Sequence, residues 1–230
     1  MNILKLSLLT SAMLLIVNCG GGGSDSSAPA LTKIETVEEA KSNFKALTAL
    51  GGFDDIDSSK SEKAFFFKTN SGSCDSGTVS VTETENKFIL VANGCTIGST
   101  YMDGTISETE LSDGTVNLTM SNLTMKNDGT ELKTSSFVIV ENESEYWSTM
   151  DGDIKVTAKC FSGNYDFKTI SKVYDAQDGT DNAESGIFEL NGARYTFSNP
   201  YVTIKTATEE ETILQSELEK RMSNSSTCTE

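Results

Sequence analysis

The chain has 230 residues, with 18 basic and 34 acidic side chains, no histidine and a net charge of −16. A surface this acidic repels nucleic acid and anionic headgroups, so it excludes nucleic-acid binding and attachment through a basic membrane patch. The lack of histidine excludes Ser-His-Asp and Cys-His catalysis as well as histidine metal sites.

Residues 1–18 have the pattern of an export signal. Lys5 is the only charged residue before Cys19, and the apolar stretch from Leu6 to Val17 is too short for a membrane-spanning helix. A short cationic start followed by a short apolar core is typical of a secretory signal peptide.

The end of this signal, Ile16-Val17-Asn18-Cys19, resembles the lipobox of bacterial lipoproteins, although Asn18 replaces the usual small residue. The resemblance implies that the Cys19 thiol receives a diacylglycerol and becomes the first residue after cleavage. It also implies palmitate-type acyl chains that anchor the protein in the bacterial cell envelope. Because Gly20 and not Asp follows the cysteine, it further implies sorting to the outer membrane, facing the periplasm or the cell surface.

Residues 19–33 form the expected lipidated cysteine and tether, because Gly20 to Ala30 are rich in glycine and serine and should behave as a flexible coil. Residues 34–230 then form a single β-rich domain, a size that β sandwiches and barrels reach as one unit.

The domain is predicted to begin with an amphipathic helix over residues 36–50. Thr36 and Glu39 have capping-box spacing, and Gly51 and Gly52 supply a stop signal. The apolar residues at three- and four-residue steps are Val37, Ala40, Phe44, Leu47 and Leu50.

A series of strands follows, because short β-branched and aromatic segments alternate with turn residues about every ten positions. We expect a mainly β fold: an antiparallel meander of about 8–10 strands that forms a curved half-barrel, a barrel or a sandwich. A bulge is expected near Ser121 and Asn122, where the apolar residues change face. The expected strands lie within residues 63–69, 77–83, 87–94, 101–110, 114–127, 131–142, 144–150, 152–160, 164–174, 185–197 and 201–208.

A second amphipathic helix is predicted over residues 209–222. Thr208 and Glu211 have capping-box spacing, and Lys220 and Arg221 lie where the negative end of the helix dipole would be. The apolar stripe consists of Ile213, Leu214, Leu218 and Met222.

Four cysteines remain besides Cys19, and an even number in an exported chain predicts two disulfides. Three connectivities are open, and we favour Cys74–Cys95 and Cys160–Cys228, since the first closes a hairpin-sized loop and the second ties the C-terminal tail to the sheet. A zinc site is disfavoured because the sequence contains neither a CxxC pair nor a histidine.

Acidic residues provide weak candidate sites. Asp175, Asp178, Asp181 and Glu184 recur at three-residue steps in a predicted loop and offer oxygen ligands for Ca²⁺, although an acidic loop without an ion is the preferred interpretation. Paired carboxylates could hydrolyse glycosides, but most acids here are expected to be turn residues and solubilising charges. These include Asp54, Asp55, Asp57, Asp151 and Asp153.

The motif C-x-x-G-x-V-x-V, at Cys74 to Val81, precedes Cys95 and the run Asp103-Gly104-Thr105-Ile106. In this it resembles a group of uncharacterised exported lipoproteins, which implies no activity and no catalytic residues. The expected helices on a curved sheet also resemble the periplasmic carriers of lipoproteins.

We therefore expect a membrane-anchored lipoprotein with a non-catalytic binding or structural role, no cofactor, and a protein or ligand partner that the sequence does not identify. A carrier of an apolar or lipid ligand is the alternative, and a carbohydrate-active enzyme comes third.

Overall fold

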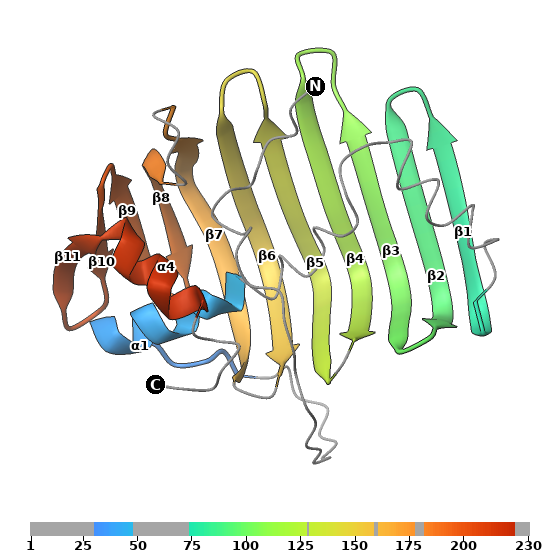
Figure 1. The fold of residues 1–230 in the computed structure, drawn as a ribbon, viewed down its shortest axis with the longest axis horizontal. Helices are drawn as coiled ribbons and strands as arrows, with labels where there is room; N and C mark the ends of the chain where they lie inside the picture. The colour runs from blue at the N-terminus through green and yellow to red at the C-terminus, as the bar shows by residue number, and fades with distance from the viewer. Residues whose placement is uncertain (1–29, 48–73, 128, 159–160, 178–181, 224–230) are drawn as a thin grey trace.

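The structure is a computed structural model that describes residues 30–47, 74–127, 129–158, 161–177 and 182–223, with side chains described as far as Lys220. Its centre is one antiparallel sheet of 11 strands, and each strand pairs with its neighbours in sequence (Figure 1). The prediction of a mainly β, antiparallel meander is thus confirmed. The strands are β1 (Ser76–Thr84), β2 (Lys87–Ile97), β3 (Thr100–Glu110), β4 (Thr115–Asn127), β5 (Thr130–Asn142), β6 (Trp147–Thr157), β7 (Ser162–Asp175), β8 (Ala183–Leu190), β9 (Ala193–Ser198), β10 (Tyr201–Lys205) and β11 (Glu210–Leu214).

The sheet is open, so the structure does not confirm the barrel or the sandwich. In the described residues β1 and β11 do not pair with each other, and no strand leaves the sheet to start a second layer. The reason is local: each hairpin returns the chain directly beside the strand that it has just left, and no long connection carries it across a face. The sheet is also uncurled, so the half-barrel form is not confirmed.

One face of the sheet carries the core. Burial alternates along β2, where Phe88, Leu90 and Ala92 are buried and the residues between them are more exposed, as the two-residue period of a strand requires. The largest fully buried side chains are Tyr165, Tyr195, Phe44, Phe137, Phe167, Leu90, Met120, Leu123, Ile154, Leu190, Ile204 and Gln215.

The bulge expected near Ser121 and Asn122 is confirmed. Asp103 pairs with Thr124 and Thr105 pairs with Ser121, so two residues of β4 lie opposite Gly104 alone. Gly104 has φ 118°, and a Cβ there would lie 2.4 Å from the Asn122 carbonyl oxygen. A glycine is required at this position because any side chain would collide with backbone.

Gly152 does not separate the expected strands 144–150 and 152–160 by a turn. It has φ 135° and lies inside the continuous strand β6, where a Cβ would approach the Ser136 carbonyl oxygen to 2.2 Å. The Asp-Gly pair therefore accommodates a bulge in the neighbouring strand and not a turn, and β6 begins only at Trp147. Conversely, residues 185–197 form two strands, because the chain turns at Asn191 and Gly192. The merger and the division leave the number of strands unchanged.

The N-terminal helix α1 (Val37–Asn43) begins as the capping box predicts. The Thr36 side chain accepts a hydrogen bond from the Glu39 amide, and the Glu39 carboxylate accepts one from the Thr36 amide. The chain then tightens into the 3₁₀ helix η1 (Phe44–Leu47). The remainder of the predicted helix, residues 48–50, and the expected strand 63–69 lie outside the described residues.

The second predicted helix is wrong over its first half. Residues 210–214 form strand β11, which pairs with β10, and helix α4 (Gln215–Ser223) starts only after it. Ile213 lies opposite Val202, so its burial comes from a neighbouring strand and not from a helical stripe. Thr208 does not cap a helix, because its hydroxyl donates to the Glu35 carbonyl oxygen at 2.7 Å.

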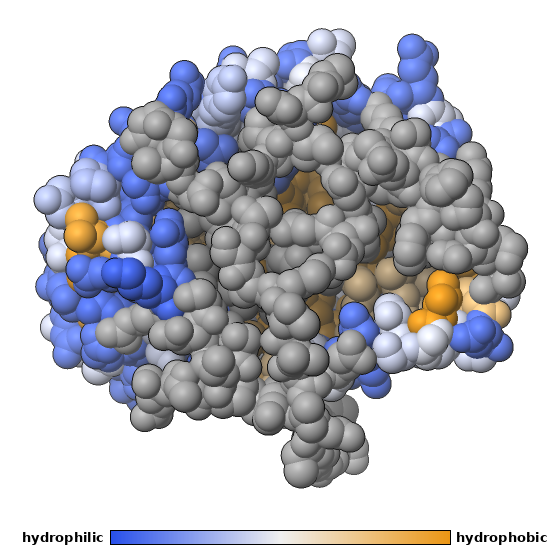
Figure 2. Space-filling view, in the orientation of Figure 1, coloured by the Kyte–Doolittle hydropathy of each residue, from blue (hydrophilic) through white to orange (hydrophobic). Residues whose placement is uncertain are grey.

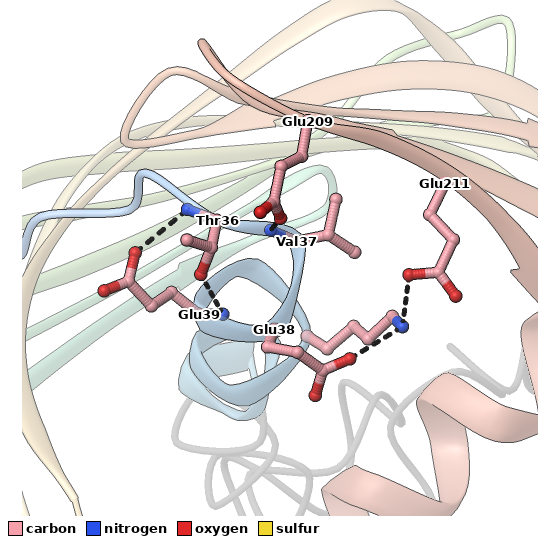
Figure 3. Close-up of polar contacts among 7 residues, drawn as sticks. Thr36, Val37, Glu38, Glu39, Glu209 and Glu211 are labelled. Atoms are coloured by element: carbon pink, nitrogen blue, oxygen red, sulfur yellow. Dashed lines mark hydrogen bonds and ion pairs between the residues drawn. The ribbon is translucent and has the colours of Figure 1, made fainter.

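Both helices lie on one face of the sheet at its β8–β11 end (Figure 1). Figure 3 shows how acids near β11 hold α1. The Glu209 carboxylate accepts a hydrogen bond from the Val37 amide at 2.8 Å, which satisfies a helix N-terminal donor. The buried Lys41 amine contacts Glu38 at 2.9 Å and Glu211 at 2.7 Å. Burial alone would lower the pKa of Lys41, but hydrogen bonds to Glu211 and Glu38 outweigh it and raise that pKa.

The opposite end of the sheet carries the predicted disulfide between Cys74 and Cys95, whose Cα atoms are 5.3 Å apart. The bond joins the residues before β1 to β2. The second expected pair, Cys160–Cys228, and the expected lipidation site Cys19 lie outside the described residues. In the face shown in Figure 2, hydrophilic side chains dominate near α1 and α4, whereas apolar side chains reach the surface toward β1 and β2.

Candidate functional site

A pocket of about 610 Å³ lies where the β5–β6 turn meets the end of β7 and the start of β8. Pockets of a few hundred cubic ångströms are the size that small ligands occupy. Its lining is polar and aromatic, consisting of Glu145, Tyr146, Tyr174, Asp175, Gln177, Glu184 and Ser185.

The β5–β6 turn is held in place by the side chain of Asn142. Its amide oxygen accepts hydrogen bonds from the Glu145 backbone amide and the Ser144 hydroxyl, each at 2.8 Å. Its amide nitrogen donates to the Thr115 hydroxyl at 3.0 Å, which ties the turn to β4. Asn142 is only 3% exposed, so the wall of the pocket that the turn forms has a rigid base.

The two tyrosines come from different elements. Tyr146 belongs to the turn and is 43% exposed, whereas Tyr174 belongs to β7 and is 38% exposed. Tyr146 has φ 55°, a left-handed conformation that is rare for bulky residues, and its carbonyl oxygen accepts the Asp175 amide at 2.9 Å. This hydrogen bond holds the turn against the end of β7.

The β8 wall rests on a buried glutamine. Gln215, which is 2% exposed, accepts a hydrogen bond from the Ala183 amide and donates to the Ala183 carbonyl oxygen, each at 2.8 Å. Since buried polar groups must be paired, these contacts position the start of β8 beside α4. Glu184 follows directly, and one of its carboxylate oxygens accepts from the Asn199 side-chain amide at 3.2 Å.

The described part of the lining is strongly acidic. It contains three carboxylates, Glu145, Asp175 and Glu184, and neither lysine nor arginine. The Glu145 carboxylate accepts a hydrogen bond from the Trp147 indole at 2.8 Å. Lys172, which is outside the lining, has its amine 3.4 Å from the centroid of the Trp147 ring.

Asp175 is a partly buried acid of this lining. Desolvation by burial raises the pKa of its carboxyl to about 6. The carboxyl is therefore mostly ionised at neutral pH and becomes protonated in mild acid. Carboxyls with raised pKa values in pockets are frequent at functional sites.

The structure places only two of the four predicted calcium ligands. Asp175 and Glu184 both line the pocket, but Asp178 and Asp181 lie outside the described residues. In the described parts of the chain, no three acidic or cysteine side chains come close enough together to hold a metal ion. Because two of the four candidate ligands lie outside the described residues, the calcium site stays a prediction.

The other acidic candidates that the structure describes support the sheet. Asp151 accepts a hydrogen bond from the Thr169 amide at 3.2 Å, and Asp153 accepts from both the amide and the hydroxyl of Ser135. Asp54, Asp55 and Asp57 lie outside the described residues. The described lining of the pocket contains none of the Val, Ile, Leu and Phe side chains that a carrier of apolar ligands would need.

Sequence reasoning missed Glu145, Tyr146, Tyr174, Gln177 and Ser185. The sequence places an acid beside a tyrosine at Glu145-Tyr146, Tyr165-Asp166 and Tyr174-Asp175, and only the structure shows that the first and the third tyrosine are exposed. Nothing local, however, shows that these two pairs meet. The pairing of Trp147 with Tyr174 across β6 and β7 brings them together.

No family model matches the chain, and neither the curated proteins nor the solved structures contain a significant match. In the described residues, no helix is both long and apolar enough to cross a membrane.

Proposed function

We propose that the chain is an exported bacterial lipoprotein, anchored through acyl chains on Cys19, whose sheet domain binds a ligand and does not catalyse a reaction. The observation that carries this proposal is the Cys74–Cys95 disulfide. Disulfides persist in oxidising compartments, which agrees with the export signal and lipobox-like residues at positions 1–19.

The binding role is supported by the form of the site. The pocket lies on a continuous sheet, and its walls are fixed by Asn142 and Gln215 through hydrogen bonds. A preformed polar pocket on a rigid scaffold is suited to recognition. A tether of about 14 glycine- and serine-rich residues would hold the domain roughly 20 Å from the lipid surface.

The anchor is tested by growing cells with labelled palmitate and comparing the native chain with Cys19→Ala. The native protein should incorporate the label and sediment with membranes, and Cys19→Ala should lose the label. Ser24→Ala, a substitution in the tether, is the matched control and should behave as the native chain. A native protein without label, or a labelled Cys19→Ala, refutes the anchor.

A glycoside hydrolase is the second candidate, and the raised pKa of Asp175 favours it. A carboxyl with a pKa of about 6 can act as a general acid, and Glu145 and Glu184 supply further carboxylates in the same pocket. Hydrolysis of chromogenic glycosides by the purified protein, abolished by Asp175→Asn, would establish this candidate and refute the non-catalytic role.

A further inference from the structure

We propose that the pocket lined by Tyr146, Tyr174, Asp175, Glu145 and Glu184 binds an organic ammonium group. This inference rests on the proposed binding role and names the chemical class of the ligand. The relevant class is a quaternary or primary ammonium carried on a small organic molecule, which the volume of about 610 Å³ accommodates.

The charge of the lining favours a cation. The three carboxylates repel an anion, and no positive side chain of the described lining compensates them. A neutral ligand would displace the water that solvates these carboxylates and would offer no positive charge in its place, so the carboxylates would lose stabilisation. An ammonium group restores that stabilisation, and the partly buried Asp175 has the most to gain, because its charge is the least solvated.

The aromatic side chains favour an organic cation over a metal ion. Tyr146 and Tyr174 are both substantially exposed and both line the pocket, so a ligand there can contact their rings. Ring faces attract ammonium groups and contact the methyl or methylene groups attached to them. Ca²⁺ favours several carboxylate ligands, and in the described residues no group of three or more acidic or cysteine side chains could hold a metal ion.

The walls are already in place for such a ligand. The left-handed backbone of Tyr146 is fixed by its hydrogen bond from the Asp175 amide, and the Ala176 amide donates to the Asn182 carbonyl oxygen at 2.9 Å. Binding a small ligand should therefore require little additional ordering of the backbone, and this low entropic cost favours affinity.

The test measures binding to the full-length protein in nonionic detergent by titration calorimetry. The probes are choline, spermidine and 3,3-dimethylbutan-1-ol, the last being a neutral isostere of choline. Choline should bind at least about ten-fold more tightly than the isostere, since only choline gains from the carboxylates and the ring faces. Tyr146→Asn removes one ring but suits the left-handed backbone, and Asp175→Asn removes the charge but keeps the shape.

Each of these substitutions should weaken choline binding by about ten-fold. The matched controls are Tyr201→Asn and Glu210→Gln, which alter an exposed tyrosine and an exposed acid outside the pocket and should leave affinity unchanged. The experiment also separates recognition from folding, because all four variants must first show a single cooperative unfolding transition, as the native protein should.

A pH series supplies a readout that a structural role would not affect. Choline keeps its charge at every pH, so a loss of affinity as the pH falls through about 6 reports protonation of the protein. This loss should vanish in Asp175→Asn. Among the described residues, the other titratable groups near Asp175 are Glu145 and Tyr146 of the turn, Lys172 and Tyr174 of β7, and Glu184 of β8.

Several results would overturn the inference: equal binding of choline and its isostere, equal affinity in all variants, or no binding of either choline or spermidine. Binding of Ca²⁺ alone, or of an oligosaccharide in place of the ammonium probes, would overturn it as well. The palmitate experiment reports on Cys19 only, so the failure of the anchor and the failure of this ligand assignment are distinguishable.

Discussion

The two ends of the sheet are secured in different ways. At the β8–β11 end, Phe44 from η1 packs against Phe188 and Tyr195 with ring centroids 5.8 and 5.2 Å away, and the Tyr195 hydroxyl donates to the Ala40 carbonyl oxygen. At the other end, β1 is largely exposed and the disulfide at Cys74 joins the chain to β2.

This contrast shows how one open sheet protects two ends. A strand at the end of a sheet needs a partner, a cover or a constraint to prevent fraying and unwanted pairing. Near β11 the end of the sheet is protected by packing against helices and aromatic rings. Near β1 the protection includes the Cys74–Cys95 disulfide. Changes at the two ends should therefore have different consequences, which the following experiments measure.

The largest effect is expected for Phe44→Ala. Phe44 is 1% exposed, so its truncation leaves a cavity between η1 and the sheet and should lower the free energy of unfolding by about 3–5 kcal/mol. Urea denaturation measures this loss. Phe44→Leu, which keeps much of the apolar volume, should lose less. A change below about 1 kcal/mol for Phe44→Ala would show that the aromatic cluster does not secure this end.

Replacing both Cys74 and Cys95 by serine should have the next largest effect. The bond spans 21 positions, and its loss should destabilise the domain by about 3 kcal/mol, through the entropy of the unfolded chain. Hydrogen exchange should show faster exchange in β1 and unchanged protection in β9 and β10. Equal acceleration at both ends would contradict the separate roles assigned to them.

The smallest effect, a gain in stability, is expected for Asp175→Asn in the pocket. Asp175 has a pKa of about 6 when folded and an ordinary value of 3.8, so its charge destabilises the folded state above pH 6. The full shift would correspond to about 3 kcal/mol, and solvent screening of this partly exposed carboxyl reduces the expected gain in the free energy of unfolding to at most about 2 kcal/mol at pH 7.

This gain should shrink as the pH falls from 6 towards 3.8, because the native carboxyl becomes protonated and the penalty disappears. Urea denaturation at pH 7 and pH 3.5 measures both values. An equal gain at both pH values would assign the effect to packing and not to charge. Binding sites often keep charged residues that destabilise the folded state, because ligand recognition requires the charge.

Much of the sheet could be predicted because its signals are local. Alternating β-branched residues and regular turn residues mark most strands, and the shift of apolar residues around Asn122 marks the bulge. Residues 210–214 could not be assigned, since Thr208 and Glu211 fit a capping box equally well. These residues form a strand because Ile213 pairs with Val202 of β10, a contact that the local sequence does not reveal.

The pocket was beyond prediction for the same reason. Tyr146 and Tyr174 are 28 positions apart, and their common location depends on the register of β6 against β7. That register includes a shift between Ser148 and Asp151, which no local pattern specifies. The raised pKa of Asp175 likewise depends on burial by other elements.

The capping of α1 by Glu209 has a consequence for the order in which the protein matures. The helix has only seven residues, too few to be stable alone, and the carboxylate that caps Val37 lies 172 positions downstream. When the chain emerges with its N-terminus first, from a ribosome or through a translocation channel, α1 cannot form stably until the β10–β11 hairpin has been synthesised and has folded. The N-terminal part of the described domain is thus completed at the end of folding, when the whole sheet is already assembled.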